Sequence, residues 1–82
     1  MNEFEYTIKD ENGVHARPAG LIARRAQELP FDVTIECKGR SASLKKLLAL
    51  MGLGIKKGDT VRVFAGDGCD ISALKDFFEK TI

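Results

Sequence analysis

Three segments of the sequence alternate apolar and polar residues with a period of two, and this pattern constrains the fold more than any other feature. Residues 4–8, 31–37 and 61–65 carry it. Such alternation is typical of β-strands that bury one face and expose the other. The Lys-Gly pair at 38–39 fits a two-residue turn into a further strand over residues 40–44, which predicts a β-hairpin.

Three other segments have the features of helices. Apolar residues recur at helical spacing over residues 19–29, and Pro30 ends that helix. Residues 44–55 are rich in leucine and in helix formers until two glycines end the run. Asp70 is suited to cap a last helix, whose apolar stripe ends at Phe78.

These elements follow one another in the order βαββαβα, which predicts the α+β class. We expect an open-faced β-sandwich, in which a four-stranded antiparallel sheet carries three helices on one face. A chain of 82 residues without an internal repeat or a composition shift supports one domain over residues 1–82.

The charge balance argues against a general affinity for nucleic acid or anionic membranes. Thirteen basic residues nearly cancel twelve acidic ones, and the formal net charge is +1. The N-terminus lacks a signal-peptide pattern, and no stretch approaches the ~18 apolar residues of a membrane span. We therefore expect a cytoplasmic location and no membrane insertion. A nucleic-acid or small-ligand binding module remains a weak alternative, because the aromatic residues have core-like spacing.

Metal and cofactor sites are not indicated. Cys37 and Cys69 are too few and too widely spaced for a zinc site, and neither is given a role. The two glycine motifs, at 52–54 and 66–68, lack the context of a phosphate-binding loop or a dinucleotide site and are interpreted as turns. We expect no cofactor and no metal ligand.

The only histidine, His15, lies in the run Gly-Val-His-Ala-Arg-Pro at residues 13–18. Pro18 fits the first turn of a helix because its missing N–H would have no intrahelical partner there. The free N–H groups of that turn and the helix dipole would stabilise a phosphate on His15, and the backbone N–H of Ala16 is a further candidate donor to it. Arg17 could add a charge-assisted hydrogen bond. A loop histidine without a function is the simpler reading of such a residue.

A second candidate site is an apolar patch. The segment 44–55 holds more large apolar residues than a short helix can bury, so some of them should be exposed. The candidate docking residues come from this segment and from the first helix: Gly20, Arg24, Lys46, Leu47, Leu48 and Met51. Arg17 and Lys45 would add positive charge around them and attract acidic partners. Core packing and solvated surface charge are the plain alternatives.

The chain resembles the HPr family, the histidine-containing phosphocarriers of the bacterial phosphoenolpyruvate-dependent sugar phosphotransferase system. The resemblance rests on residues 13–19, on the segment that ends Met-Gly-Leu-Gly-Ile at 51–55, on the Lys-Gly-Asp turn at 57–59 and on the closing helix. It implies a carrier that is not itself an enzyme. The sequence leaves the oligomeric state open, but a carrier must release each partner quickly, so we expect a monomer. Enzyme I would phosphorylate His15 on Nδ1, and enzyme IIA domains of sugar permeases would receive the group. The resemblance also implies that Leu47, Leu48 and Met51 dock on both partners.

Lys46 departs from one branch of that family. There, a serine at this position starts the second helix and is phosphorylated by a regulatory kinase, whereas lysine cannot be. Ser41 and Ser43 do not occupy the helix start, so we expect no such regulation. A regulatory paralogue in a nitrogen-related or other non-sugar phosphotransfer chain would use the same His15, and the sequence does not separate it from the sugar-system carrier.

Overall fold

The computed structural model describes residues 1–82, and its elements occur in the predicted order. The strands are β1 (Glu3–Thr7), β2 (Val33–Cys37), β3 (Arg40–Ser43) and β4 (Thr60–Ala65). The helices are α1 (Ala16–Gln27), α2 (Leu47–Met51) and α3 (Ser72–Thr81). No helix has the length and apolar character that crossing a membrane requires.

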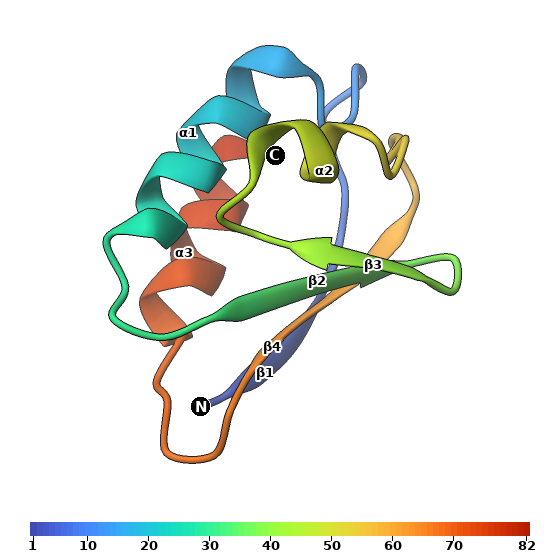
Figure 1. Ribbon diagram of the computed structural model, residues 1–82. Helices are drawn as coiled ribbons and strands as arrows, with labels where there is room; N and C mark the ends of the chain where they lie inside the picture. Colours follow the sequence, from blue (N-terminus) through green and yellow to red (C-terminus); the bar gives the residue numbers. More distant parts are fainter.

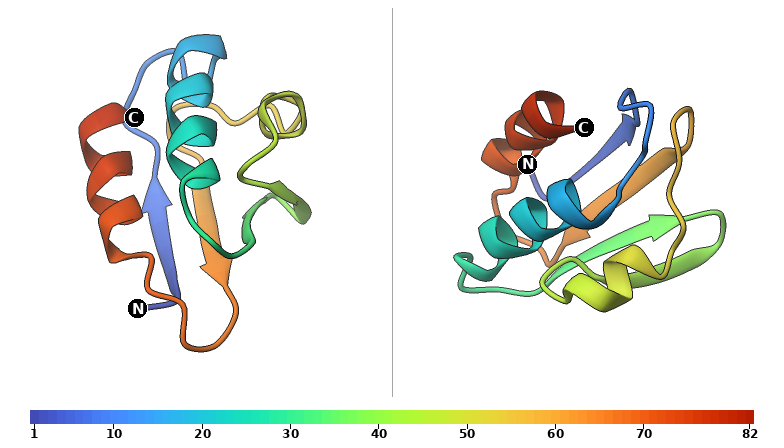
Figure 2. Two further views of the ribbon diagram at one scale, coloured as in Figure 1. Left: turned by 60° about the vertical axis from the view of Figure 1, so that its left-hand side comes forward. Right: turned by 90° about the horizontal axis from the view of Figure 1, so that it is seen from above.

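The strands form one antiparallel sheet in the order β1-β4-β2-β3 (Figure 1). The three helices cover one face of this sheet, with α1 between α3 and α2 (Figure 2). The predicted fold class, an open-faced sandwich, is confirmed. Lys38 and Gly39 both have positive φ angles, of 54° and 77°, as a tight two-residue hairpin turn requires.

The alternating residues of the strands form the core on the helix-covered face. Val63 on β4 lies opposite Phe4 on one side and Ile35 on the other, and all three are buried. The ring of Phe78 on α3 packs edge to face against Phe4 and Tyr6, with centroid distances of 5.4 and 6.0 Å. This packing fixes α3 over β1 and brings its last turn toward the loop that follows β1.

Helix α1 begins earlier than predicted. The first intrahelical bond runs from the N–H of Ala19 to the carbonyl of His15, at 2.9 Å, so the helix starts at Ala16 rather than after Pro18. Pro18 is then the third residue of the helix, where a missing N–H still costs no hydrogen bond. The helix ends at Gln27, two residues before the predicted end.

The other two helices also differ from their predicted limits. The segment 44–55 contains a helix of only five residues, and Leu44, Leu53 and Ile55 are buried outside it. The N-cap residue of α3 is Ile71 rather than the predicted Asp70. The Asp70 carboxylate nevertheless accepts a hydrogen bond from the N–H of Ser72, the first residue of the helix, at 3.0 Å. The distribution of apolar residues did not predict where the helices begin and end, because a buried loop can have the same apolar composition as a buried helix.

Candidate functional site

His15 is the N-cap residue of α1. Its backbone is extended, with φ −96° and ψ −176°, and its exposed ring makes no hydrogen bond within the chain. The N–H groups of Ala16 and Arg17 donate no hydrogen bond either, and the first turn contains no acidic residue. The structure thus places an accessible imidazole beside free donors at the positive end of a helix.

The loop before His15 is held by the segment that follows α2. Val14 donates its N–H to the carbonyl of Ile55 at 3.0 Å. Gly13 has a φ of +66°, and a Cβ there would overlap the carbonyl oxygen of Ile55 and lie 2.7 Å from Cα of Lys56. Only glycine therefore fits this close backbone approach without strain. The position of His15 is set by a long-range contact as well as by its own helix.

A cavity of about 370 Å³ lies beside His15. Arg17 and Pro18 line it from α1, Asp10 from the preceding loop, and Lys80 from the last turn of α3. Neither Asp10 nor Lys80 was among the predicted site residues. Their proximity depends on how α3 packs against β1, and no local pattern reports that packing.

A second hollow, of about 380 Å³, lies between α1 and α2. It brings together Arg17, Gly20, Arg24 and Leu47, which the sequence analysis had grouped from two distant segments. The position of Gly20 leaves open space, since a Cβ built there meets no atom within 4 Å. Because Arg17 lines both this groove and the His15 cavity, the two hollows adjoin.

The apolar residues near the groove divide into exposed and buried ones. Leu48 is 82% exposed and Leu47 is 38% exposed, whereas Leu50, which follows them in the same helix, is buried in the core at 1%. Met51 is half-buried and packs against the core. Leu21 on α1 is 47% exposed and lines both hollows, and the sequence analysis missed it. The sequence did contain a signal for Leu21, because it is a large apolar residue outside the apolar stripe that α1 buries.

The basic residues around the groove have two different roles. Arg17, Arg24 and Lys46 are exposed and form no ion pair, and Lys46 is the N-cap residue of α2. Lys45 instead donates from Nζ to the carbonyl of Leu29 at 2.8 Å. This bond to a neutral carbonyl leaves the positive charge of Lys45 in place, so the expectation that Lys45 adds positive charge around the patch stays a prediction.

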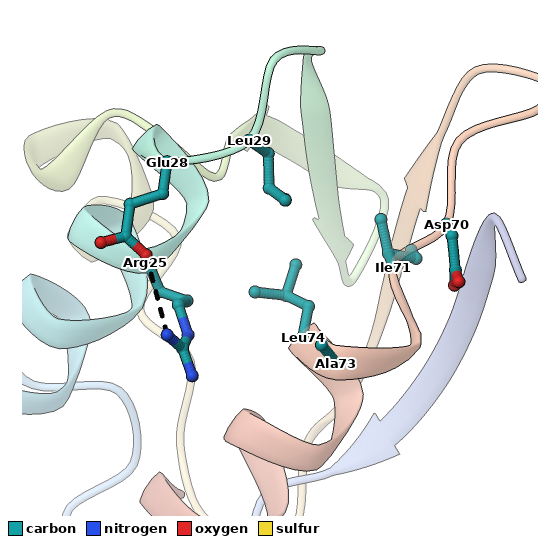
Figure 3. A pocket seen from close by; sticks show the side chains of 7 residues that line it. All are labelled: Arg25, Glu28, Leu29, Asp70, Ile71, Ala73 and Leu74. Atoms are coloured by element: carbon teal, nitrogen blue, oxygen red, sulfur yellow. Dashed lines mark ion pairs between the residues drawn. The ribbon is translucent and has the colours of Figure 1, made fainter.

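A third cavity, of about 240 Å³, lies at the opposite end of α1 and α3 (Figure 3). Leu29, Ile71 and Leu74 form its apolar wall, and Arg25 pairs with Glu28 at its edge at 3.7 Å. It shares no residue with the His15 cavity. Its position separates it from the candidate phosphoryl site.

The two cysteines lie outside both hollows near His15. Cys37 is buried at the end of β2, and Cys69 is half-buried; neither forms a disulfide. Burial raises the pKa of the Cys37 thiol above its ordinary value, and the nearby Asp59 carboxylate adds to this rise. A raised pKa disfavours the reactive thiolate at neutral pH.

Comparisons with a family model and with solved structures match nearly the whole chain. Residues 2–80 match the family model described as the PTS HPr component phosphorylation site. HPr-C-His of Thermoanaerobacter tengcongensis is 32% identical, with a TM-score of 0.88 over 99% of this chain and 94% of that one. The histidine-containing phosphocarrier protein of Mycoplasma is 30% identical, with a TM-score of 0.82 over 96% of this chain and 89% of that one. HPr of Bacillus anthracis, at 24% identity and a TM-score of 0.82, shares the fold over 98% of this chain and 94% of its own.

Proposed function

Since this chain belongs to the HPr family of phosphotransferase-system phosphocarriers, we propose that it accepts a phosphoryl group on His15 from phosphorylated enzyme I and passes it to enzyme IIA domains of sugar permeases. It does so as a monomer in the cytoplasm, through a single domain spanning residues 1–82 and without a cofactor. It is a carrier of a covalent intermediate rather than an enzyme with its own turnover.

The observation that carries this proposal is the unbonded ring of His15 at the N-terminus of α1. A carrier must meet a donor and an acceptor in turn, and an exposed ring can reach both. The N–H groups of Ala16 and Arg17 are free to donate to the phosphoryl oxygens. The guanidinium of Arg17, which lines the same cavity, is free of ion pairs and can bind them as well.

The transfer step needs only the imidazole and a phosphorylated donor. The lone pair of one ring nitrogen, which we assign to Nδ1 by resemblance to the family, forms the bond to phosphorus. The bond between phosphorus and the donor atom breaks, and its electron pair stays on the donor. The second ring nitrogen keeps its proton. Transfer to enzyme IIA is the same exchange with His15 as the leaving group.

We assign partner docking to the groove between α1 and α2 and to the exposed leucines beside it. Leu47 and Leu48 offer apolar surface, and Arg24 and Lys46 add unpaired positive charge next to it. A small apolar centre with a charged rim suits a partner that must bind and leave quickly. Met51, at the border of the core, would adapt its flexible side chain to either partner.

Regulation by serine phosphorylation at the start of α2 is absent from this proposal. Lys46 is the N-cap residue of α2, the position that carries the serine in the kinase-regulated branch of the family. Ser41 and Ser43 belong to β3 and precede the helix. Their hydroxyl groups therefore do not take the place of a serine at position 46.

The test is intact-protein mass spectrometry after incubation with phosphoenolpyruvate and a bacterial enzyme I of matched lineage. Wild type should gain one acid-labile phosphoryl group, and His15→Ala should gain none. The free energy of unfolding of His15→Ala should differ from that of wild type by no more than about 0.5 kcal/mol, as for ordinary surface substitutions, because the side chain is exposed and makes no hydrogen bond.

Two results would contradict the proposal. The first is an absence of any adduct on wild type with a competent enzyme I. The second is an adduct that survives in His15→Ala, which would place the phosphoryl group on another residue. Transfer from the phosphorylated chain to purified enzyme IIA domains of sugar systems, compared with those of nitrogen-related systems, then separates the two carrier roles.

A further inference from the structure

The His15 cavity contains a second basic side chain besides Arg17. Lys80, in the last turn of α3, lines the cavity together with His15 and Arg17. It is exposed, and it forms neither an ion pair nor a hydrogen bond within the chain. Its ammonium group therefore has three donors available to a ligand in this cavity.

The place of Lys80 beside the cavity is fixed by the fold. The carbonyl of Ile82 accepts the N–H groups of Lys9 and Asp10, at 2.8 and 2.9 Å, and Ile82 is buried. These bonds join the end of α3 to the loop between β1 and α1. Lys80 lies two residues before this anchor, so the last turn of α3 stays next to His15 while the long lysine side chain remains free to turn.

The charges around the cavity make such a cation useful. The C-terminus of α3 carries a partial negative charge, and the Asp10 carboxylate also faces the cavity. Both would repel a phosphoryl group on His15. The carboxylate of Asp10 is engaged by the N–H of Asn12 at 2.8 Å, which leaves its charge in place. A cation on the last turn of α3 offsets this repulsion.

We propose that Lys80 contacts the phosphoryl group on His15, so that the group is bound from two sides by Arg17 with the start of α1 and by Lys80 from the end of α3. This inference rests on the proposed function of His15. Lys80 stabilises the dianionic form of the phosphoryl group, and it assists transfer by neutralising the negative end of α3. A solvated lysine at a helix end is the alternative, and it would leave the phosphoryl group unaffected.

The decisive measurement is the pKa of the phosphoryl group, followed by ³¹P NMR. Because His15 is the only histidine, potassium phosphoramidate can phosphorylate its ring without enzyme I. In Lys80→Gln the phosphoryl group should bind its proton about two- to fivefold more tightly than in wild type, the size expected for loss of a solvent-exposed ion pair. Lys80→Arg should keep the wild-type pKa.

Lys57→Gln is the matched control, because it removes the same charge from an exposed lysine that lines no cavity near His15. It should titrate as wild type does. The proposal is overturned if Lys80→Gln also titrates as wild type, or if Lys57→Gln changes the pKa as much, since a general change in net charge would then explain the effect. Equal melting temperatures confirm that the variants are folded.

A second arm uses enzyme I. The kcat/KM of enzyme I for the Lys80→Gln variant should fall about two- to fivefold, and Lys80→Arg should restore it. Failure of enzyme I to phosphorylate wild type would contradict the proposed function alone, because the chemically phosphorylated chain still reports whether Lys80 contacts the phosphoryl group. An unchanged kcat/KM in Lys80→Gln would contradict the role of Lys80 in transfer.

Discussion

The N–H of Val14 donates a 3.0 Å hydrogen bond to the carbonyl of Ile55, and through this bond the loop that carries His15 rests on the segment that follows α2. The candidate phosphoryl site and the candidate docking helix are therefore parts of one backbone framework. A change in this contact should alter the position of His15 even when the histidine itself is intact.

Substitution of Gly13 tests this framework. In Gly13→Ala the new Cβ overlaps the carbonyl of Ile55 and the residue keeps a φ of +66°, so the free energy of unfolding should fall by about 2 kcal/mol or more. Gly39→Ala is the control, because its φ is also positive but its Cβ meets no atom within 4 Å. Urea denaturation measures both, and equal losses would show that the contact at Ile55 adds nothing.

Leu48 and Leu50 lie in the same short helix but should behave in opposite ways. Leu48→Ala should leave stability unchanged within about 0.5 kcal/mol and should lower the kcat/KM of enzyme I for this chain by about tenfold, as loss of an interface anchor does. Leu50→Ala removes a buried side chain and should cost about 2–5 kcal/mol of stability. Thermal melting and phosphorylation rates measured on both variants check this. A normal transfer rate in Leu48→Ala would remove Leu48 from the docking surface.

Lys46 should make the chain inert to the bifunctional serine kinase of the regulated branch. With this kinase and ATP, wild type should yield no phosphoserine by mass spectrometry. Lys46→Ser should become a substrate, and its new N-cap should stabilise α2 by about 0.5–1 kcal/mol. A phosphoserine at Ser41 or Ser43 of wild type would contradict the prediction.

Asp59 should make the stability of the fold depend on pH, with a loss of stability in acid. It accepts the N–H of Lys56 at 2.9 Å and pairs with Lys38 at 3.1 Å, and these contacts lower the pKa of its carboxyl below the ordinary value. A carboxyl with a lowered pKa stabilises the fold above the unfolded-state pKa of about 3.9, and this contribution is lost as the pH falls through the folded-state pKa. Asp59→Asn should lower the melting temperature at pH 7 and reduce the drop in melting temperature on acidification.

Asp76→Asn is the control for that experiment. Its carboxylate is exposed on α3 and forms no hydrogen bond or ion pair within the chain. The variant should melt as wild type does across the same pH range. An Asp59→Asn variant with the same acid response as wild type would show that Asp59 does not contribute to the pH dependence.

The strands could be predicted from the sequence because their signal is local. Phe4 and Tyr6 alternate with charged residues, and in the structure the first set is buried while Glu3 and Glu5 are exposed. The candidate site at His15 could be predicted for the same reason. The glycine, the histidine and Pro18 are close in sequence, and together they indicate a helix start beside an exposed ring.

Contacts between distant segments could not be predicted. Lys80 has the sequence context of any lysine in the last turn of a helix. The packing of Phe78 on β1 and the hydrogen bonds to Ile82 bring it to the His15 cavity. Lys45 resembles its neighbour Lys46 in sequence, yet its ammonium group binds the carbonyl of Leu29. The apolar run over residues 44–55 predicted a helix longer than the observed Leu47–Met51, because residues buried in a loop have the same apolar composition as residues buried in a helix.

The hydrogen bonds from Lys9 and Asp10 to Ile82 have a consequence for the newly made chain. His15 leaves the ribosome before the wall of its cavity that contains Lys80 has been synthesised. The paired strands β1 and β4 are also far apart in the sequence, and such pairings form late in folding. A growing polypeptide thus exposes the imidazole of His15 before the surrounding charges exist. Under the proposed function, phosphoryl exchange through the complete cavity would then wait for the α3 segment to dock.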